Sequence, residues 1–120
     1  MLNLKYLALS QCLKCEQSLI MQEIERKFLV NKEAWIKQVK TICVHISQAY
    51  LHNSKDQTTR LRLRDDKAYL TVKGPTLGLT RSEYEYEIPF QDAEQMILDF
   101  KLKVLTKRRY LIDYASKTWE

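Results

Sequence analysis

Alternating apolar and polar side chains run through most of this chain. Six stretches, at residues 23–30, 43–51, 58–65, 67–73, 81–88 and 104–114, alternate with a period of two, which is typical of strands with one buried face. Helical spacing replaces the alternation at residues 31–39, where Asn31 is a favourable N-cap, and again at residues 91–100. Short polar loops separate the strands. The pattern therefore predicts an α+β domain built on an antiparallel sheet.

Charged side chains occupy one face of most of these predicted strands. Arg60 and Arg62 lie on one face of their strand, and Leu61 and Leu63 lie on the other. Two interpretations are open: a flat sheet whose wet face is held by cross-strand ion pairs, or a sheet rolled into a barrel with a charged interior. The repetition of charge in strand after strand favours the barrel, whose interior would bind a densely charged ligand. The charged positions of this kind are Glu23, Glu25, Lys27, Arg60, Arg62, Lys73, Glu83, Glu85, Lys107 and Arg109.

Composition and charge point to an anionic partner, which could be a nucleic acid, a membrane surface or a small polyphosphate. The chain has 120 residues, enough for one small domain, and a net charge of +5. Gly74 and Gly78 are its only glycines, so a phosphate group would have to be held by side chains rather than by a glycine-rich loop. Tyr84 and Tyr86 lie opposite the charges, which argues against a nucleic acid partner. No apolar run approaches the roughly 18 residues of a membrane-spanning helix, so we expect no membrane partner.

The cysteines and the first twenty residues add little chemistry. Cys12 and Cys15 form a C-x-x-C pair without a second pair, which disfavours a zinc site and favours a reduced, cytoplasmic chain. Met21 stands two residues before the first strong strand pattern. We therefore interpret residues 1–20 as an N-terminal extension from an upstream start codon, with few contacts to the domain at residues 21–120. A genuine amphipathic arm is the alternative.

Five charged motifs follow one another along the chain. Glu23 opens an E-x-E-x-K strand, Arg60 opens an R-x-R pair, and Lys73 closes the next strand. Arg81 opens an R-x-E-x-E strand, and Lys107 opens a K-x-R-Y motif. In this order, over residues 21–120, the chain resembles the CYTH superfamily, the triphosphate tunnel metalloenzymes. It is most similar to the short bacterial members that resemble inorganic triphosphatases.

The resemblance implies an antiparallel tunnel of eight strands, with charged side chains in the lumen and helices packed outside. It implies Lys27 and Glu25 as catalytic residues and Mg²⁺ or Mn²⁺ as the cofactor, because hard cations prefer carboxylate oxygens. The residues implied to bind phosphate are Lys27, Arg60, Arg62, Lys73, Arg81, Lys107 and Arg109. The residues implied to hold metal are Glu23, Glu25, Glu83 and Glu85. The implied activity is divalent-metal-dependent hydrolysis of inorganic triphosphate or of an organic triphosphate.

The sequence stops before the last strands of the family pattern. Family members continue past the tryptophan into a strand with alternating acidic residues, whereas this sequence stops at Trp119 and Glu120. We therefore expect a C-terminally truncated tunnel of about six strands, or a tunnel that a homodimer completes. Two alternative functions stay open. One is ATP cyclisation of the class IV adenylyl cyclase type, and the other is non-catalytic binding of polyphosphate or nucleotide.

Overall fold

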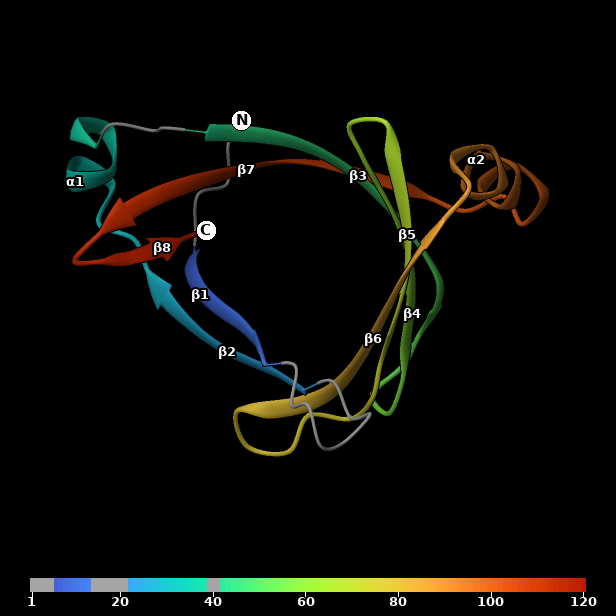
Figure 1. The fold of residues 1–120 in the computed structure, drawn as a ribbon, viewed down its shortest axis with the longest axis horizontal. Coiled ribbons are helices and arrows are strands. Elements are labelled where there is room, and N and C mark those ends of the chain that lie inside the picture. The colour runs from blue at the N-terminus through green and yellow to red at the C-terminus, as the bar shows by residue number, and fades with distance from the viewer. Residues whose placement is uncertain (1–5, 14–21, 39–41) are drawn as a thin grey trace.

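A curled antiparallel sheet with two helices makes up the computed structural model, which describes residues 6–13, 22–38 and 42–120 (Figure 1). Within these ranges the sheet has eight strands in the order β1-β2-β6-β5-β4-β3-β7-β8. The strands are β1 (Tyr6–Leu13), β2 (Gln22–Leu29), β3 (Ile42–Asn53), β4 (Thr58–Arg64), β5 (Lys67–Lys73), β6 (Thr80–Ile88), β7 (Val104–Tyr114) and β8 (Lys117–Trp119). The helices are α1 (Lys32–Lys37) and α2 (Phe90–Asp99). The predicted α+β class and antiparallel sheet are confirmed.

Two strands in the described ranges go beyond the six that the alternation predicts. β1 pairs with β2 along its whole length, from Tyr6 opposite Leu29 to Leu13 opposite Gln22. The interpretation of residues 1–20 as an N-terminal extension stays a prediction. β8 pairs with the end of β7 and has only three residues, too few for a clear alternation. The expected number of about six strands was therefore too low.

The sheet curls until its two edge strands approach each other. Figure 1 shows the strands arranged as a ring, with β1 and β8 close together and with α1 and α2 outside the ring on opposite sides. No hydrogen-bonded ladder joins β1 to β8 in the described part of the chain. The ring therefore has an open seam at this point rather than a continuous wall of hydrogen bonds.

The helix α2 covers the outer face of β4 and β5. Leu61 on β4, Ala68 on β5 and Ala93 on α2 are fully buried between the helix and the sheet, and Leu61 lies directly opposite Leu70 in the β4–β5 ladder. Partly buried apolar side chains surround these residues: Leu51, Leu63, Leu70, Ile88, Phe90, Met96, Ile97 and Leu102. The alternation of these strands therefore directs their apolar side chains outward to the helix and their polar side chains toward the inside of the ring.

The short helix α1 begins where the sequence predicts. The Asn31 side chain accepts hydrogen bonds from the backbone N–H groups of Glu33 and Ala34, which satisfies two of the free donors at the helix start. Trp35 is the buried residue of α1 and makes an edge-to-face contact with Tyr110 of β7, with ring centroids 5.7 Å apart. The helix is therefore fixed against the outer side of β7.

We expect the core beneath α2 to dominate the stability of the curled sheet. Leu61→Ala should lower the free energy of unfolding by about 2–5 kcal/mol, because it removes buried methyl groups and leaves a cavity. Leu98→Ala is the matched control, since Leu98 lies on α2 but is 69% exposed. Urea denaturation followed by circular dichroism measures both values. Equal effects of the two substitutions would contradict the packing described here.

Candidate functional site

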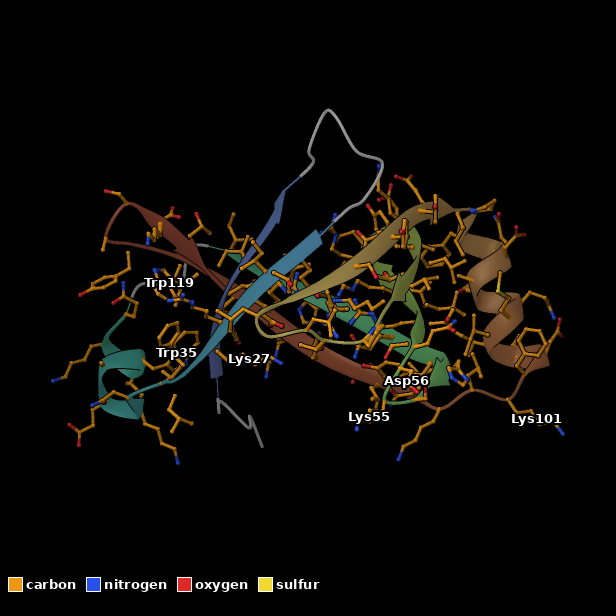
Figure 2. The ribbon with its side chains drawn as sticks, turned by 90° about the horizontal axis from the view of Figure 1, so that it is seen from below. Lys27, Trp35, Lys55, Asp56, Lys101 and Trp119 are labelled. Carbon is orange, nitrogen blue, oxygen red and sulfur yellow. The ribbon has the colours of Figure 1, made fainter. Side chains whose placement is uncertain are left out.

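The ladder registers place the predicted site residues on the inner face of the ring. Directly opposed residues of an antiparallel ladder point to the same side, and Glu23 lies opposite Arg81 while Lys73 lies opposite Glu83. The α2 core occupies the other side, so the charged side chains face inward. Figure 2 shows nitrogen- and oxygen-bearing side chains gathered in the middle of the molecule, between α1 and α2. The inward positions are Glu23, Glu25, Lys27, Arg60, Arg62, Lys73, Arg81, Glu83, Glu85, Lys107 and Arg109.

Four of these residues form a compact ion-pair cluster, here called the Lys73 cluster: Glu23, Lys73, Arg81 and Glu83. The Lys73 Nζ lies 2.8 and 2.7 Å from the two carboxylate oxygens of Glu23 and 3.0 Å from Oε2 of Glu83. Arg81 Nε donates to Glu23 Oε2 at 2.6 Å. Lys73 is only 6% exposed, so its charge depends on these partners.

The electrostatics of the Lys73 cluster separate its two carboxylates. Burial opposes the ionisation of Glu23, but hydrogen bonds from Lys73 and Arg81 outweigh it and lower the pKa of Glu23 to about 2. Burial and the nearby negative charge of Glu23 raise the pKa of Glu83, despite its contact with Lys73. Glu23 is therefore the firmly ionised member of the pair, and Glu83 takes up a proton more readily.

A second group of inward residues carries positive charge without full compensation. We call it the basic wall: Arg60 and Arg62 on β4, and Lys107 and Arg109 on β7. Arg60 is only 8% exposed, and its Nε and Nη2 have no hydrogen-bond partner among the described residues; neither has Nε of Arg62. The Arg62 Nη1 is 3.8 Å from Glu85 Oε2, which is too long for a hydrogen bond. Buried guanidinium donors without acceptors indicate a place for an anion.

The cations of the basic wall destabilise one another's charge. Burial, followed by the charges of Arg60 and Arg109, lowers the pKa of Arg62. The Lys107 residue as a whole is exposed, yet its ammonium is partly enclosed by protein atoms. This burial, together with the positive charges of Arg109, Arg62 and Arg60, lowers the pKa of Lys107 to about 8. Glu120 offsets part of this repulsion through a 2.9 Å ion pair with Arg109.

Glu25 and Lys27 of β2 lie at the rim of the inner face. The Glu25 Oε2 lies 3.8 Å from the Lys27 Nζ, and the Lys27 side chain is 61% exposed. Both residues line a cavity of about 190 Å³ with Glu23, Arg81 and loop residues that include Thr76. Lys27 and Glu25 therefore lie beside the Lys73 cluster. Their catalytic roles stay a prediction.

The described residues do not assemble a metal site on their own. They contain no group of three or more Asp, Glu, His or Cys side chains placed to hold one ion. Glu23 and Glu83 are both bound to Lys73, and Glu85 accepts a hydrogen bond from Thr71 Oγ1 at 2.9 Å. Glu25 has the loosest contact of the four predicted ligands. Metal binding by Glu23, Glu25, Glu83 and Glu85 therefore stays a prediction.

Two buried polar residues of the inner face were not predicted as site residues. Thr71 is fully buried, and the alternation in its strand does place it on the same face as Lys73. Gln48 is 8% exposed and lies directly opposite Arg62. Gln48 is uncharged, so the charge pattern of the sequence does not identify it. The pairing of β3 with β4 places it beside the basic wall.

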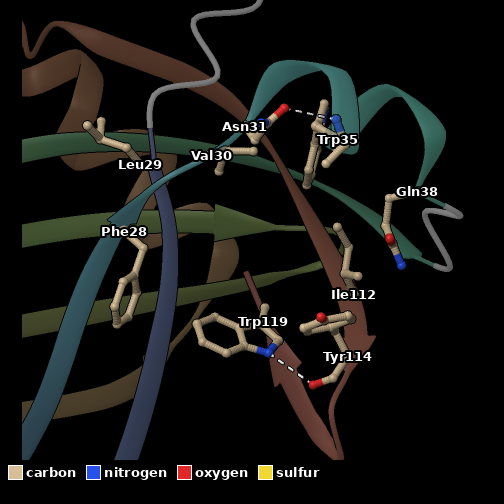
Figure 3. Close-up of a pocket in the computed structure, with 10 residues that line it drawn as sticks. Phe28, Leu29, Val30, Asn31, Trp35, Gln38, Ile112, Tyr114 and Trp119 are labelled. Atoms are coloured by element: carbon tan, nitrogen blue, oxygen red, sulfur yellow. Dashed lines mark hydrogen bonds between the residues drawn. The ribbon is translucent and has the colours of Figure 1, made fainter.

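The other well-formed cavity near the seam of the ring is apolar. It has a volume of about 290 Å³ and lies between the end of β2, α1, β7 and β8, as Figure 3 shows. Phe28 and Trp119 meet there edge to face, with centroids 5.7 Å apart. None of the described residues that line this cavity is charged, so it does not suit a phosphate group. Among the described residues, no helix is long and apolar enough to span a membrane.

Comparisons with known proteins identify the family of this chain. An inorganic triphosphatase from Acetivibrio thermocellus is 41% identical over 101 residues, which cover 82% of this chain and 63% of the relative. The chain thus spans less than two thirds of the length of that curated relative. A solved structure described as the hypothetical protein NE1496 has 23% identity and a TM-score of 0.45, over 65% of this chain and 51% of that one, and is too distant to support an inference. The model of the CYTH domain matches residues 21–119. This chain therefore belongs to the CYTH domain family.

Proposed function

We propose that this chain binds the triphosphate group of a small molecule on the inner face of its ring and hydrolyses it with a divalent cation. The observation that carries this proposal is a pair of buried guanidinium donors without acceptors among the described residues, Nε and Nη2 of Arg60. Such donors are costly to bury unpaired, and phosphate oxygens satisfy them with charge-assisted hydrogen bonds. The 41% identity to an inorganic triphosphatase supports the same substrate class.

The charge of the basic wall suits a polyphosphate better than a single phosphate. Burial and the positive charges of Arg109, Arg62 and Arg60 together lower the pKa of Lys107. A ligand with several negative charges relieves this mutual repulsion, and the planar guanidinium groups contact phosphate oxygens in pairs. These cations would also stabilise charge on the phosphoryl oxygens as a terminal phosphate leaves. Lys73 is already neutralised by two carboxylates and would hold the opposite side of the ligand less strongly.

The cation requirement rests on the family resemblance. Mg²⁺ or Mn²⁺, when bound, would supply Lewis-acid chemistry for phosphoryl transfer. The described carboxylates do not form a complete site, and Glu25 is the one that we expect to be most available. A cytoplasmic location, a homodimer and the absence of a nucleic acid partner likewise stay predictions.

The basic wall should contribute strongly to the binding of tripolyphosphate. Arg62→Ala should weaken the binding of tripolyphosphate roughly 10- to 100-fold, because it removes charge-assisted hydrogen bonds. Arg108→Ala is a matched control: it removes the same charge from β7, where Arg108 is exposed and points away from the inner face. Isothermal titration calorimetry measures both affinities. Equal losses in the two variants would show that only net charge matters and would contradict the proposed site.

The binding of tripolyphosphate should be separable from its hydrolysis. Tripolyphosphate should still bind in EDTA, since the basic wall is assembled without a metal ion. Glu25→Gln should reduce phosphate release in Mg²⁺ or Mn²⁺ by at least about tenfold and should leave the affinity in EDTA unchanged. A phosphate-release assay beside calorimetry tests both points. Binding without any phosphate release by the unaltered chain would favour the non-catalytic alternative.

The affinity for tripolyphosphate should depend on pH. The pKa of Lys107 is about 8 in the free protein, and a bound polyanion should raise it, because negative charge stabilises the protonated ammonium. Binding near pH 8 should therefore take up protons, and affinity should fall as the pH rises through this range. Calorimetry in buffers of different ionisation enthalpy measures the uptake. The Lys107→Arg variant should lose the part that belongs to Lys107, and an identical uptake in this variant would contradict the assignment.

A further inference from the structure

Gln48 has an unusual environment for a neutral residue. It lies on β3 within the basic wall, directly opposite Arg62, and is only 8% exposed. Its Nε2 donates to the Tyr50 hydroxyl oxygen at 3.3 Å. Its Oε1 is buried and has no hydrogen-bond partner among the described residues. A buried amide oxygen without a donor is costly, so this atom needs a partner that another state of the site supplies.

The complementary group lies on the next strand. Arg62 Nε is also buried without a partner, and the Cα atoms of Gln48 and Arg62 are directly paired across the β3–β4 ladder. The Arg62 Nη1 lies nearest to Glu85 Oε2, but the 3.8 Å separation is too long for a hydrogen bond. An unpaired acceptor and an unpaired donor therefore face the same side of adjacent strands.

We propose that Gln48 is a positioning residue for Arg62. When the terminal amino groups of Arg62 donate to a phosphate, the Gln48 Oε1 accepts the remaining Nε–H and fixes the plane of the guanidinium. A carboxylate at this position would also accept that hydrogen bond, but it would neutralise the cation and repel the phosphate. A neutral amide orients the guanidinium and keeps its full charge for the ligand. This inference rests on the proposed binding of a triphosphate group.

A double-mutant cycle tests the inference with tripolyphosphate as the probe. Gln48→Met keeps the length of the side chain and removes the acceptor. As a single substitution it should weaken the binding of tripolyphosphate about five- to tenfold. In the Arg62→Ala background the same substitution should have no further effect, because its target is gone. In the Lys27→Ala background it should keep its full effect, since Lys27 lies at the exposed rim.

A second variant excludes a purely structural role. Gln48→Glu should place a carboxylate beside Arg62, so thermal stability should not fall while tripolyphosphate affinity falls by more than in Gln48→Met. A loss of stability in step with affinity would overturn the proposal, as would a Gln48→Met effect that persists undiminished without Arg62. If Arg62→Ala weakens binding and Gln48→Met does not, only this inference fails. If the unaltered chain does not bind tripolyphosphate, the proposed function fails first and this inference fails with it.

Discussion

The Lys73 ammonium joins three strands of the ring, and the placement of the first motif strand depends on it. Within the described ranges, β2 pairs with β6 over three residue positions, from Gln22 to Ile24. Lys73 on β5 bridges this short ladder, because it binds both Glu23 on β2 and Glu83 on β6. A buried ammonium is tolerated only with such partners, and the removal of either partner leaves a charge uncompensated. The motif E-x-E-x-K therefore has a structural role in addition to any role toward a ligand.

This use of the carboxylates gives the inner face two unequal sides. On the side of β2, β5 and β6, acids and bases neutralise one another at distances of 2.6 to 3.0 Å. On the side of β3, β4 and β7, Arg60 and Arg62 keep donors without acceptors in the described part of the chain, and burial together with positive neighbours lowers the pKa of Lys107. A bound anion would relieve these unfavourable interactions, so in the proposed function the asymmetry that costs stability provides affinity.

The sequence was sufficient for those features that alternation and charge determine. The strand faces of Leu61 and Arg62, the N-cap at Asn31 and the outward position of α2 all follow from local patterns, and the structure confirms them. Strand pairing is non-local, so the sequence did not identify β1 as the neighbour of β2 or Gln48 as the neighbour of Arg62. The engagement of Glu23 with Lys73 depends on the same non-local geometry, and parity alone could not distinguish an ion pair from a metal ligand.

The Nε–H groups of Arg60 and Arg62 are central to the proposed binding site, and nuclear magnetic resonance observes them individually in ¹⁵N-labelled protein. We expect both resonances to shift on addition of tripolyphosphate, because Arg60 gains a phosphate acceptor and the guanidinium of Arg62 is fixed by its new partners. The Nε–H resonance of Arg108, which is exposed on the outer face, should stay in place under the same titration. Unchanged resonances of Arg60 and Arg62, or an equal shift of Arg108, would contradict the account.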